Sequence, residues 1–195
     1  MKTLLFTFLA FCIACSSFAQ EQEIKYSFKE IGWDISIPAK FHMLSRDSFL
    51  RIEQKGKAAI KEATGVSSGN DHKKLFVVLE GPANYMDATI VAFDTVKDGD
   101  WHETNALVRD MLAETFTRQM PQAKVDTASS TFIKDGRQFS QFYIKVGLPN
   151  GRLMHLYMFS ALINGYDFGY TMTFIDEEKG KAFYSAWEKS RFTRQ

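Results

Sequence analysis

Three closely spaced turn signals between residues 131 and 175 constrain the fold of this chain more than any other feature of its sequence. They are Asp135-Gly136, Pro149-Asn150-Gly151 and Asn164-Gly165. Asp-Gly and Asn-Gly favour two-residue hairpin loops, because both loop residues need a positive φ angle. The segments between the turns are rich in β-branched and aromatic residues, which is typical of strands. The stretch therefore predicts a meander of four antiparallel strands.

Two-residue loops also predict a register for the meander. A loop at Asn164-Gly165 pairs Ile163 with Tyr166, and a loop at Asn150-Gly151 pairs Leu148 with Leu153. Because side chains alternate between the faces of a sheet, this register gathers one set of residues on a single face. That face is almost wholly apolar and aromatic, and its members are Phe142, Ile144, Val146, His155, Tyr157, Phe159, Ala161, Phe168, Tyr170, Met172 and Phe174.

The opposite face of the meander is largely apolar as well. It carries Phe132, Phe139, Tyr143, Met154, Leu156, Met158 and Leu162. A strand with one face in water would show polar alternation, so the strand over residues 152–163 is predicted to be central and covered on both faces. Helices are the expected cover.

The rest of the chain supplies the other elements. Strands are predicted over residues 26–31, 33–37, 75–79, 88–93 and 124–133, and helices over residues 48–64, over residues 100–121 with Asp100 as N-cap, and from Asp176 onwards. The second helix has an expected buried stripe of Leu107, Val108, Met111, Leu112 and Phe116, and the last helix one of Ala182, Phe183, Ala186 and Trp187. The predicted fold class is α+β, with a single antiparallel sheet, a C-terminal β-meander and helices packed on both faces.

The first 19 residues are typical of a secretory signal peptide. Lys2 precedes an apolar run over residues 4–14 that is too short to span a bilayer, and Ser17-Phe18-Ala19 offers a cleavage site. Residues 20–195 then form one α+β domain, a size suited to a single core. The expected localisation is export, to a periplasm or the cell exterior.

A second interpretation of the leader stays open. Ile13-Ala14-Cys15 partly resembles a bacterial lipobox, in which Cys15 is acylated and anchors the protein to a membrane. The position three residues earlier is Cys12, where such boxes usually carry Leu. We favour cleavage after Ala19, and a membrane is an expected partner only if Cys15 is lipidated.

Charge and cysteine content exclude several classes of function. The chain has 24 Lys and Arg residues against 23 Asp and Glu residues, and no basic patch stands out, which argues against nucleic acid as a partner. Cys12 and Cys15 are the only cysteines, so the domain after Ala19 has no thiol nucleophile and no cysteine-based metal site. We expect no cofactor.

Two segments partly match metal-binding motifs but lack residues that those motifs need, so no metal site is expected. His102-Glu103 would open a zinc-protease motif only if a second His stood at position 106, which is Ala106. Asp94, Asp98 and Asp100 lack the alternating oxygen ligands and the closing Glu of a calcium loop. No catalytic residue is assigned.

The layout resembles the PsbP-like family, which includes DcrB-type bacterial envelope proteins and a Ran-binding nuclear import factor. The resemblance rests on an aromatic strand that ends in proline, Trp33-Asp34-Ile35-Ser36-Ile37-Pro38, and on a terminal helix that closes with Lys189-Ser190-Arg191-Phe192. It covers residues 26–192 and implies an α/β/α sandwich. It implies no catalytic motif, and the helix over residues 48–64 departs from the family pattern.

His155, Tyr157 and Tyr170 are the candidate ligand-binding residues. His155 is predicted on the aromatic face, either as a buried ligand or base or, as we favour, as a core histidine with one hydrogen-bond partner. Tyr157 and Tyr170 would line an apolar pocket if a cavity lay between this face and a helix. If side chains fill that space, both residues belong to the core.

Three hypotheses for function follow. The preferred one is a non-enzymatic protein-interaction or accessory module of the cell envelope, whose partner is another envelope protein. The first alternative is a carrier of a small apolar ligand held between the sheet and a helix. The second is an unrecognised hydrolase, which needs a His and a carboxylate within hydrogen-bond reach in a cleft. The oligomeric state is left open.

Overall fold

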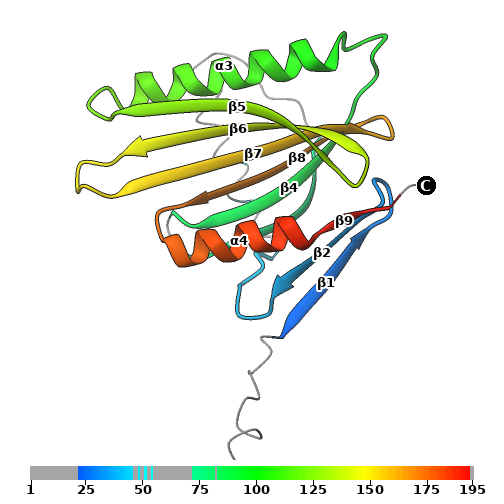
Figure 1. Ribbon diagram of the computed structural model, residues 1–195, viewed down its shortest axis with the longest axis horizontal. Helices are drawn as coiled ribbons and strands as arrows, with labels where there is room; N and C mark the ends of the chain where they lie inside the picture. Colours follow the sequence, from blue (N-terminus) through cyan, green and yellow to red (C-terminus); the bar gives the residue numbers. More distant parts are fainter. Residues whose placement is uncertain are drawn as a thin grey trace, which may run out of the picture.

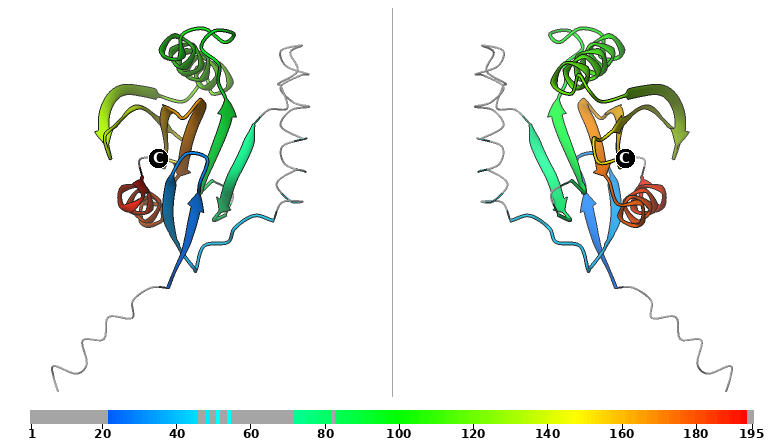
Figure 2. Two further views of the ribbon diagram at one scale, coloured as in Figure 1. Left: turned by 90° about the vertical axis from the view of Figure 1, so that its right-hand side faces the viewer. Right: turned by 90° about the vertical axis from the view of Figure 1, so that its left-hand side faces the viewer.

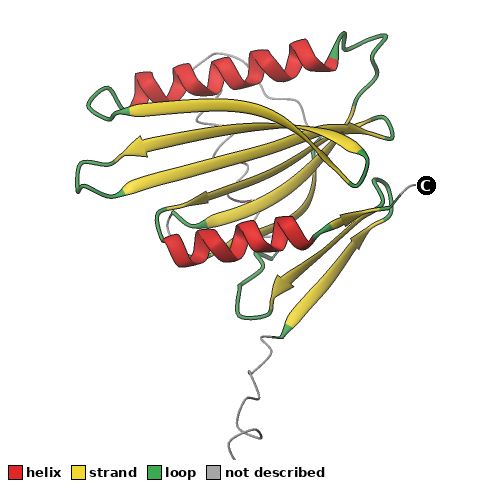
Figure 3. Ribbon diagram, viewed as in Figure 1, coloured by secondary structure: helices red, strands yellow, loops and turns green. Residues whose placement is uncertain are grey.

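Two antiparallel sheets and two helices make up the part of the chain that the computed structural model describes, which is residues 22–45, 48, 51, 54, 72–81 and 83–193. The smaller sheet has the order β1 (Glu23–Phe28), β2 (Trp33–Pro38), β9 (Arg191–Phe192). The larger sheet has the order β3 (Lys73–Leu79), β4 (Tyr85–Ala92), β8 (Tyr166–Phe174), β7 (Leu153–Ile163), β6 (Arg137–Gly147), β5 (Val125–Lys134). The helices are α3 (Trp101–Gln119) and α4 (Glu177–Lys189) (Figures 1 and 3).

The prediction of a single sheet between helices is wrong. β1 pairs with β2, and β2 pairs in turn with β9, which follows α4, so these three strands form a layer separate from the larger sheet. α3 packs on one face of the larger sheet, and α4 shares the other face with the smaller sheet (Figure 2). The reason is that Trp33 and Phe192, at opposite ends of the domain, lie opposite each other in register and are both buried. We call the two faces of the larger sheet the α3 side and the α4 side.

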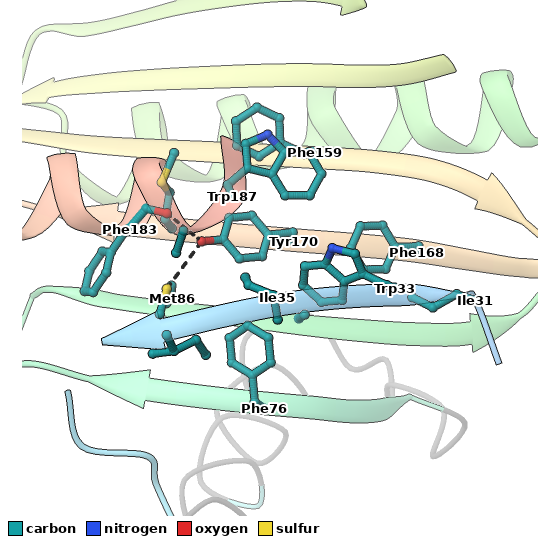
Figure 4. Packing of buried hydrophobic residues seen from close by; sticks show 14 of the residues in the cluster. Ile31, Trp33, Ile35, Phe76, Met86, Phe159, Phe168, Tyr170, Phe183 and Trp187 are labelled. Carbon is teal, nitrogen blue, oxygen red and sulfur yellow. Dashed lines mark hydrogen bonds between the residues drawn. The ribbon is translucent and has the colours of Figure 1, made fainter. Parts of the chain in front are cut away.

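The main core lies on the α4 side and is built from aromatic rings (Figure 4). The Trp187 ring of α4 stacks on Phe159 and Tyr170, with centroid distances of 4.6 and 5.0 Å. Trp33 of β2 meets Phe168 edge to face at 5.0 Å. Each such side chain contributes about 1.5–3 kcal/mol on burial, so a domain without disulfides obtains its stability from this cluster.

The β7–β8 hairpin has the predicted register. Ile163 lies opposite Tyr166 and Phe159 opposite Tyr170. Asn164 and Gly165 have φ angles of 51° and 77°, as a two-residue loop with two positive φ angles requires. The expected role of the Asn-Gly dipeptide is therefore confirmed at this turn.

The predicted β6–β7 register is wrong by one residue. Gly147, and not Leu148, lies opposite Leu153. The Leu148 N–H donates to the Arg152 carbonyl oxygen at 2.8 Å, and the Gly151 N–H donates to the Leu148 carbonyl oxygen at 2.9 Å. Because Pro149 restricts its own φ to about −65°, it starts a longer turn in which Gly151, with φ 77°, is left-handed and Asn150 is not.

This shift moves alternate residues of β6 across the sheet. Phe142, Ile144 and Val146 lie on the α3 side, in a second hydrophobic cluster with Leu156. Leu112 and Phe116 of α3 pack against that cluster as predicted. The expected burial of the rest of the α3 stripe is wrong, because Leu107 and Met111 are 69% and 63% exposed and Val108 is 40% exposed.

Both helices begin as predicted. The Asp100 side chain accepts a hydrogen bond from the Glu103 N–H, and Asp176 accepts from Glu178 and Lys179. Phe183, Ala186 and Trp187 of α4 are buried, as expected. Neither described helix combines the length and the apolar character that a membrane span needs. The leader, Cys15 and nearly all of the helix predicted over residues 48–64 lie outside the described residues.

Candidate functional site

The best candidate for a binding site is a group of half-buried aromatic side chains on the α4 side of β6 and β7. In Figure 1, α4 lies beside these strands, and no described helix crosses the face that they turn to the viewer. The group comprises Tyr143 of β6, His155 and Tyr157 of β7, and Tyr184 of α4, all partly exposed. We call these four residues the tyrosine face.

Strand register and helix packing bring the four residues together. Tyr143 lies directly opposite Tyr157 in the β6–β7 pair, and their ring centroids are 4.5 Å apart. Tyr184 comes from α4 and meets the Tyr157 ring edge to face at 6.0 Å. Aromatic pairs of this kind add about 0.5–1.5 kcal/mol beyond the area that they bury. The face is therefore ordered before any partner binds.

His155 lies on the same sheet face, between Tyr143 and Phe174. Its ring stacks on Phe174 of β8 at 5.1 Å, and its Nδ1 atom lies 2.7 Å from the Tyr143 hydroxyl. Its Nε2 atom is enclosed and has no hydrogen-bond partner, and it lies 3.4 Å from Oε1 of Glu177. With one nitrogen engaged and the other shielded from solvent, the imidazole orients Tyr143 and is closed to a substrate.

The tyrosine hydroxyls are held in their neutral form. Burial, followed by the neighbouring Tyr157 hydroxyl and the Glu177 carboxylate, raises the pKa of Tyr143 to about 12. Burial also raises the pKa of Tyr157 and of Tyr184. A phenol becomes a nucleophile when its pKa is lowered, so these shifts favour a hydrogen-bonding contact surface over a reactive centre.

The three predicted site residues do not form one site. His155 and Tyr157 lie together on the tyrosine face. Tyr170 is fully buried in the main core, where its hydroxyl donates to the Phe183 carbonyl oxygen at 3.0 Å and lies 3.3 Å from the Met86 sulfur (Figure 4). Tyr170 therefore packs in the core, which was the alternative to lining a ligand pocket.

Sequence reasoning missed Tyr143 and Tyr184. Tyr143 was placed on the opposite face by the assumed two-residue loop at Asn150-Gly151. The polar residues Gln141 and Lys145, which alternate with Phe142 and Ile144, were the available signal, because they mark a strand with one wet face. Nothing in the sequence around Tyr184, apart from its helical spacing, indicated that it would lie beside Tyr157.

An open hollow of about 320 Å³ at the start of α3 is a second candidate. It is lined by Thr95, Asp100, Trp101, His102, Arg137, Gln138 and Leu162. The Trp101 indole N–H donates to Oδ1 of Asp167 at 2.8 Å, and burial raises the pKa of Asp167. Arg137 donates to the Thr193 carbonyl oxygen, and its Nε atom is enclosed without a partner. The hollow offers one cation and no aligned nucleophile and base.

Metal and histidine–carboxylate chemistry find little support in the described residues. No group of three or more His, Cys, Asp or Glu side chains there is arranged to hold a metal ion. His72 lies near enough to the Asp167 carboxyl to lower its pKa, against the larger opposite effect of burial. Nδ1 of His42 lies 3.2 Å from Oε1 of Glu80, but the His42 side chain is 89% exposed. That pair lies on the open surface and not in a cleft.

Comparison with known proteins identifies the fold. The sequence matches no protein-family model, and no curated protein matches it. The structure is similar to the solution structure of cyanobacterial PsbP (CyanoP) from Synechocystis sp. PCC 6803, with a TM-score of 0.55 and 10% identity over 92% of this chain and 97% of that chain. A protein of unknown function from Pseudomonas aeruginosa, PA94, gives a TM-score of 0.39 and 15% identity over 89% of this chain and 99% of that one, which carries no argument. The PsbP-like resemblance is confirmed as a resemblance of fold.

Proposed function

We propose that this protein is a non-enzymatic interaction module that binds another protein of the cell envelope through the tyrosine face. The observation that carries the proposal is the set of partly exposed rings of Tyr143, Tyr157 and Tyr184, which contact one another beside α4. Tyrosine is enriched at the energetic centres of protein interfaces, because it offers a large rigid surface and a hydrogen-bonding hydroxyl.

The charges around the face suit a polypeptide partner. Lys145 forms an ion pair with Asp126 at 3.4 Å, and Glu177 is two-thirds exposed beside His155. An apolar centre with a polar rim is the usual anatomy of a protein interface. The similarity to PsbP supports an accessory module only at the level of fold.

A carrier of a small apolar ligand is less well supported. Its pocket was expected between the aromatic sheet face and a helix. Trp187 fills that position and stacks on both Phe159 and Tyr170. The protein's own side chains therefore fill the space in which the ligand pocket was expected.

The proposed location is the cell envelope or the exterior, after removal of residues 1–19. It is supported by the n-region, the short apolar run and the small residues before Gln20. Anchoring through Cys15 is the alternative. The intact mass of the native protein separates the two, because an acylated Cys15 start and a Gln20 start differ in both residues and lipid.

Site-specific photo-crosslinking in the native envelope tests the proposal. A benzophenone amino acid replaces Tyr184, and a matched variant carries it at Val96, which is 92% exposed and distant in sequence from the face. We expect one discrete polypeptide adduct from position 184 and none from position 96. The adduct should disappear when Tyr157→Ala is added, because the replacement removes the centre of the face.

Two results would contradict the proposal. Equal crosslinking from both positions would mean that the face has no special affinity. Native mass spectrometry that finds a small molecule retained on the purified protein, with no polypeptide, would move the conclusion to the carrier.

A further inference from the structure

His155 is the one histidine of the chain's four that is not exposed. Its side chain is 13% accessible to solvent, and its two ring nitrogens have different surroundings. Nδ1 lies 2.7 Å from the Tyr143 hydroxyl oxygen. Nε2 is enclosed, has no hydrogen-bond partner and lies 3.4 Å from Oε1 of Glu177. A buried polar atom without a partner costs free energy, so an enclosed nitrogen beside a carboxylate needs an explanation.

The charges around the imidazole favour its protonated form. Glu177, at the start of α4, supplies a carboxylate beside Nε2. Lys145 lies directly opposite His155 in the β6–β7 pair, but its ammonium is 3.4 Å from Asp126 of β5, which offsets its charge. Lys181, one turn after Glu177 on α4, is exposed, so water and salt screen it. The other described neighbours on this face are uncharged rings, those of Tyr143, Tyr157 and Phe174.

In its neutral form an imidazole carries a proton on one nitrogen and a lone pair on the other. The proton belongs on Nε2 of His155, because a lone pair there would face the Glu177 carboxylate. Nδ1 is then an acceptor, and the Tyr143 hydroxyl donates to it. Burial, followed by the Tyr157 hydroxyl, raises the pKa of Tyr143 to about 12. The hydroxyl therefore keeps its proton at physiological pH, and only the direction of its O–H bond can change.

Protonation of His155 reverses the hydrogen bond to Tyr143. An imidazolium donates from both nitrogens and accepts at neither. Nε2–H then forms a charge-assisted pair with Glu177, which ties the first turn of α4 to β7. Nδ1–H donates to the Tyr143 oxygen, so the hydroxyl proton must point away from the imidazole. Because Tyr143 is partly exposed, the tyrosine face then presents an O–H donor that the neutral form uses internally.

We propose that His155 is a pH-sensitive switch of the tyrosine face, which binds its partner more tightly when the imidazole is protonated. The partner contributes a carbonyl or carboxylate oxygen that accepts from Tyr143. Because imidazoles in proteins usually exchange their proton between about pH 8 and 5, the face responds to mild acidification. One added hydrogen bond raises affinity by about two- to tenfold. The inference deepens the proposed function by adding its regulation, and it rests on that function.

Nitrogen-15 NMR of the imidazoles in the purified protein tests the switch without a partner. We expect the His155 signals at about pH 8 to show a proton on Nε2 and none on Nδ1, and at about pH 5 to show both nitrogens protonated. Glu177→Gln removes the charge that favours the imidazolium, so proton uptake should occur at a pH lower by about 0.5 or more. Glu178→Gln, one residue along α4, is the matched control and should leave the proton uptake unchanged.

The photo-crosslink from position 184 tests the effect on binding. Its yield in isolated envelopes should be about two- to tenfold higher at about pH 5.5 than at about pH 8. Tyr143→Phe keeps the ring and removes the hydroxyl, so the yields at the two pH values should become equal. His42→Gln removes a histidine that lies beside a carboxylate on the open surface, and the rise in yield at the lower pH should persist in this variant.

Three results would overturn the inference. The first is a His155 imidazole that takes up no proton over this pH range, or whose proton uptake is unchanged by Glu177→Gln. The second is an equal crosslink yield at both pH values in the natural protein. The third is a rise in yield that survives Tyr143→Phe, because the hydroxyl would then not be the responding group. Absence of the crosslink at every pH, together with the expected proton uptake, would instead contradict the proposed function and not the switch.

Discussion

Gly180 of α4 faces the Phe174 ring with no room for a methyl group, which makes Gly180→Ala an informative substitution. A Cβ atom at this position would lie 2.4 Å from both Cδ2 and Cε2 of Phe174. Carbon atoms pack at about 3.5–4.0 Å, so the ring or the helix must move by about 1 Å. Phe174 is buried and stacks on His155, so any movement is passed to the tyrosine face.

Two opposing effects set the magnitude. In a free helix, Ala is more favourable than Gly by about 0.8–1.0 kcal/mol. Overpacking a filled core costs about 1–3 kcal/mol. The clash involves three atoms of a buried ring, so we expect it to dominate and to lower the free energy of unfolding by about 1 kcal/mol. Urea denaturation at neutral pH measures this difference, with an unchanged slope if unfolding remains two-state.

A double-mutant cycle isolates the cause. Phe174→Ala removes the ring, and in that background Gly180→Ala meets no obstacle and should stabilise the protein by about the helix-propensity difference of 1 kcal/mol. The sign of the effect therefore reverses between the two backgrounds. If Gly180→Ala stabilised the protein to the same extent with and without Phe174, the close packing of α4 on β8 would be refuted.

Two further substitutions test single groups. Asn84→Ala should cost about 2–4 kcal/mol in urea unfolding, because the buried Asn84 side chain accepts from the Ile175 and Asp176 N–H groups at 3.0 Å each and so ties the start of α4 to β4. Asp167→Asn keeps an acceptor for the Trp101 indole N–H and removes a carboxyl group whose pKa is raised by burial. Because the pKa is raised in the folded state, the natural protein loses stability as the pH rises above about 4, the ordinary pKa of Asp, and the variant does not. The variant should exceed the natural protein in stability at pH 7 and match it near pH 3, and a constant difference across that range would contradict the assignment.

Features encoded within a few residues were predictable from the sequence. Asn164-Gly165 specified the β7–β8 register, and Asp100 and Asp176 specified the starts of both helices. Each of these signals acts through bonds between neighbours in the chain. The physical cause and its structural effect lie in the same segment, so reading the segment is sufficient.

Pairings between distant segments were not predictable in this way. Nothing local to Trp33 indicates that β2 pairs with β9 and leaves the larger sheet. The alternating pattern of β2, buried at Trp33, Ile35 and Ile37, fits an edge strand in one sheet as well as a layer over another. The fit between Trp33 and the rings of the main core decides between an edge strand and a separate layer. A pattern of apolar and polar residues does not describe this fit.

The candidate site shows the same division. His155 and Tyr157 were singled out because they share a face on one strand. Tyr143 was missed because a single residue, Pro149, changes the loop and so the face of every residue in β6. A shift of one residue in register moves every side chain of a strand to the other face, so an error at the turn became an error at the site.

The width of the larger sheet explains why a face remains open at this position. Six strands with spacings of about 4.8 Å span about 24 Å, whereas one helix is about 10–12 Å across. α4 covers β8 and part of β7, and the smaller sheet covers the side toward β3 and β4. The parts of β6 and β7 around Tyr143 and Tyr157 are only partly buried, unlike Phe139, which packs on Trp187. They require side chains that are stable at a water boundary, and tyrosine satisfies this with an apolar ring and a polar end. Leucine at Tyr143 and Tyr157 would satisfy packing and not hydration, so tyrosine at these positions is explained by a face that the fold leaves partly exposed to water.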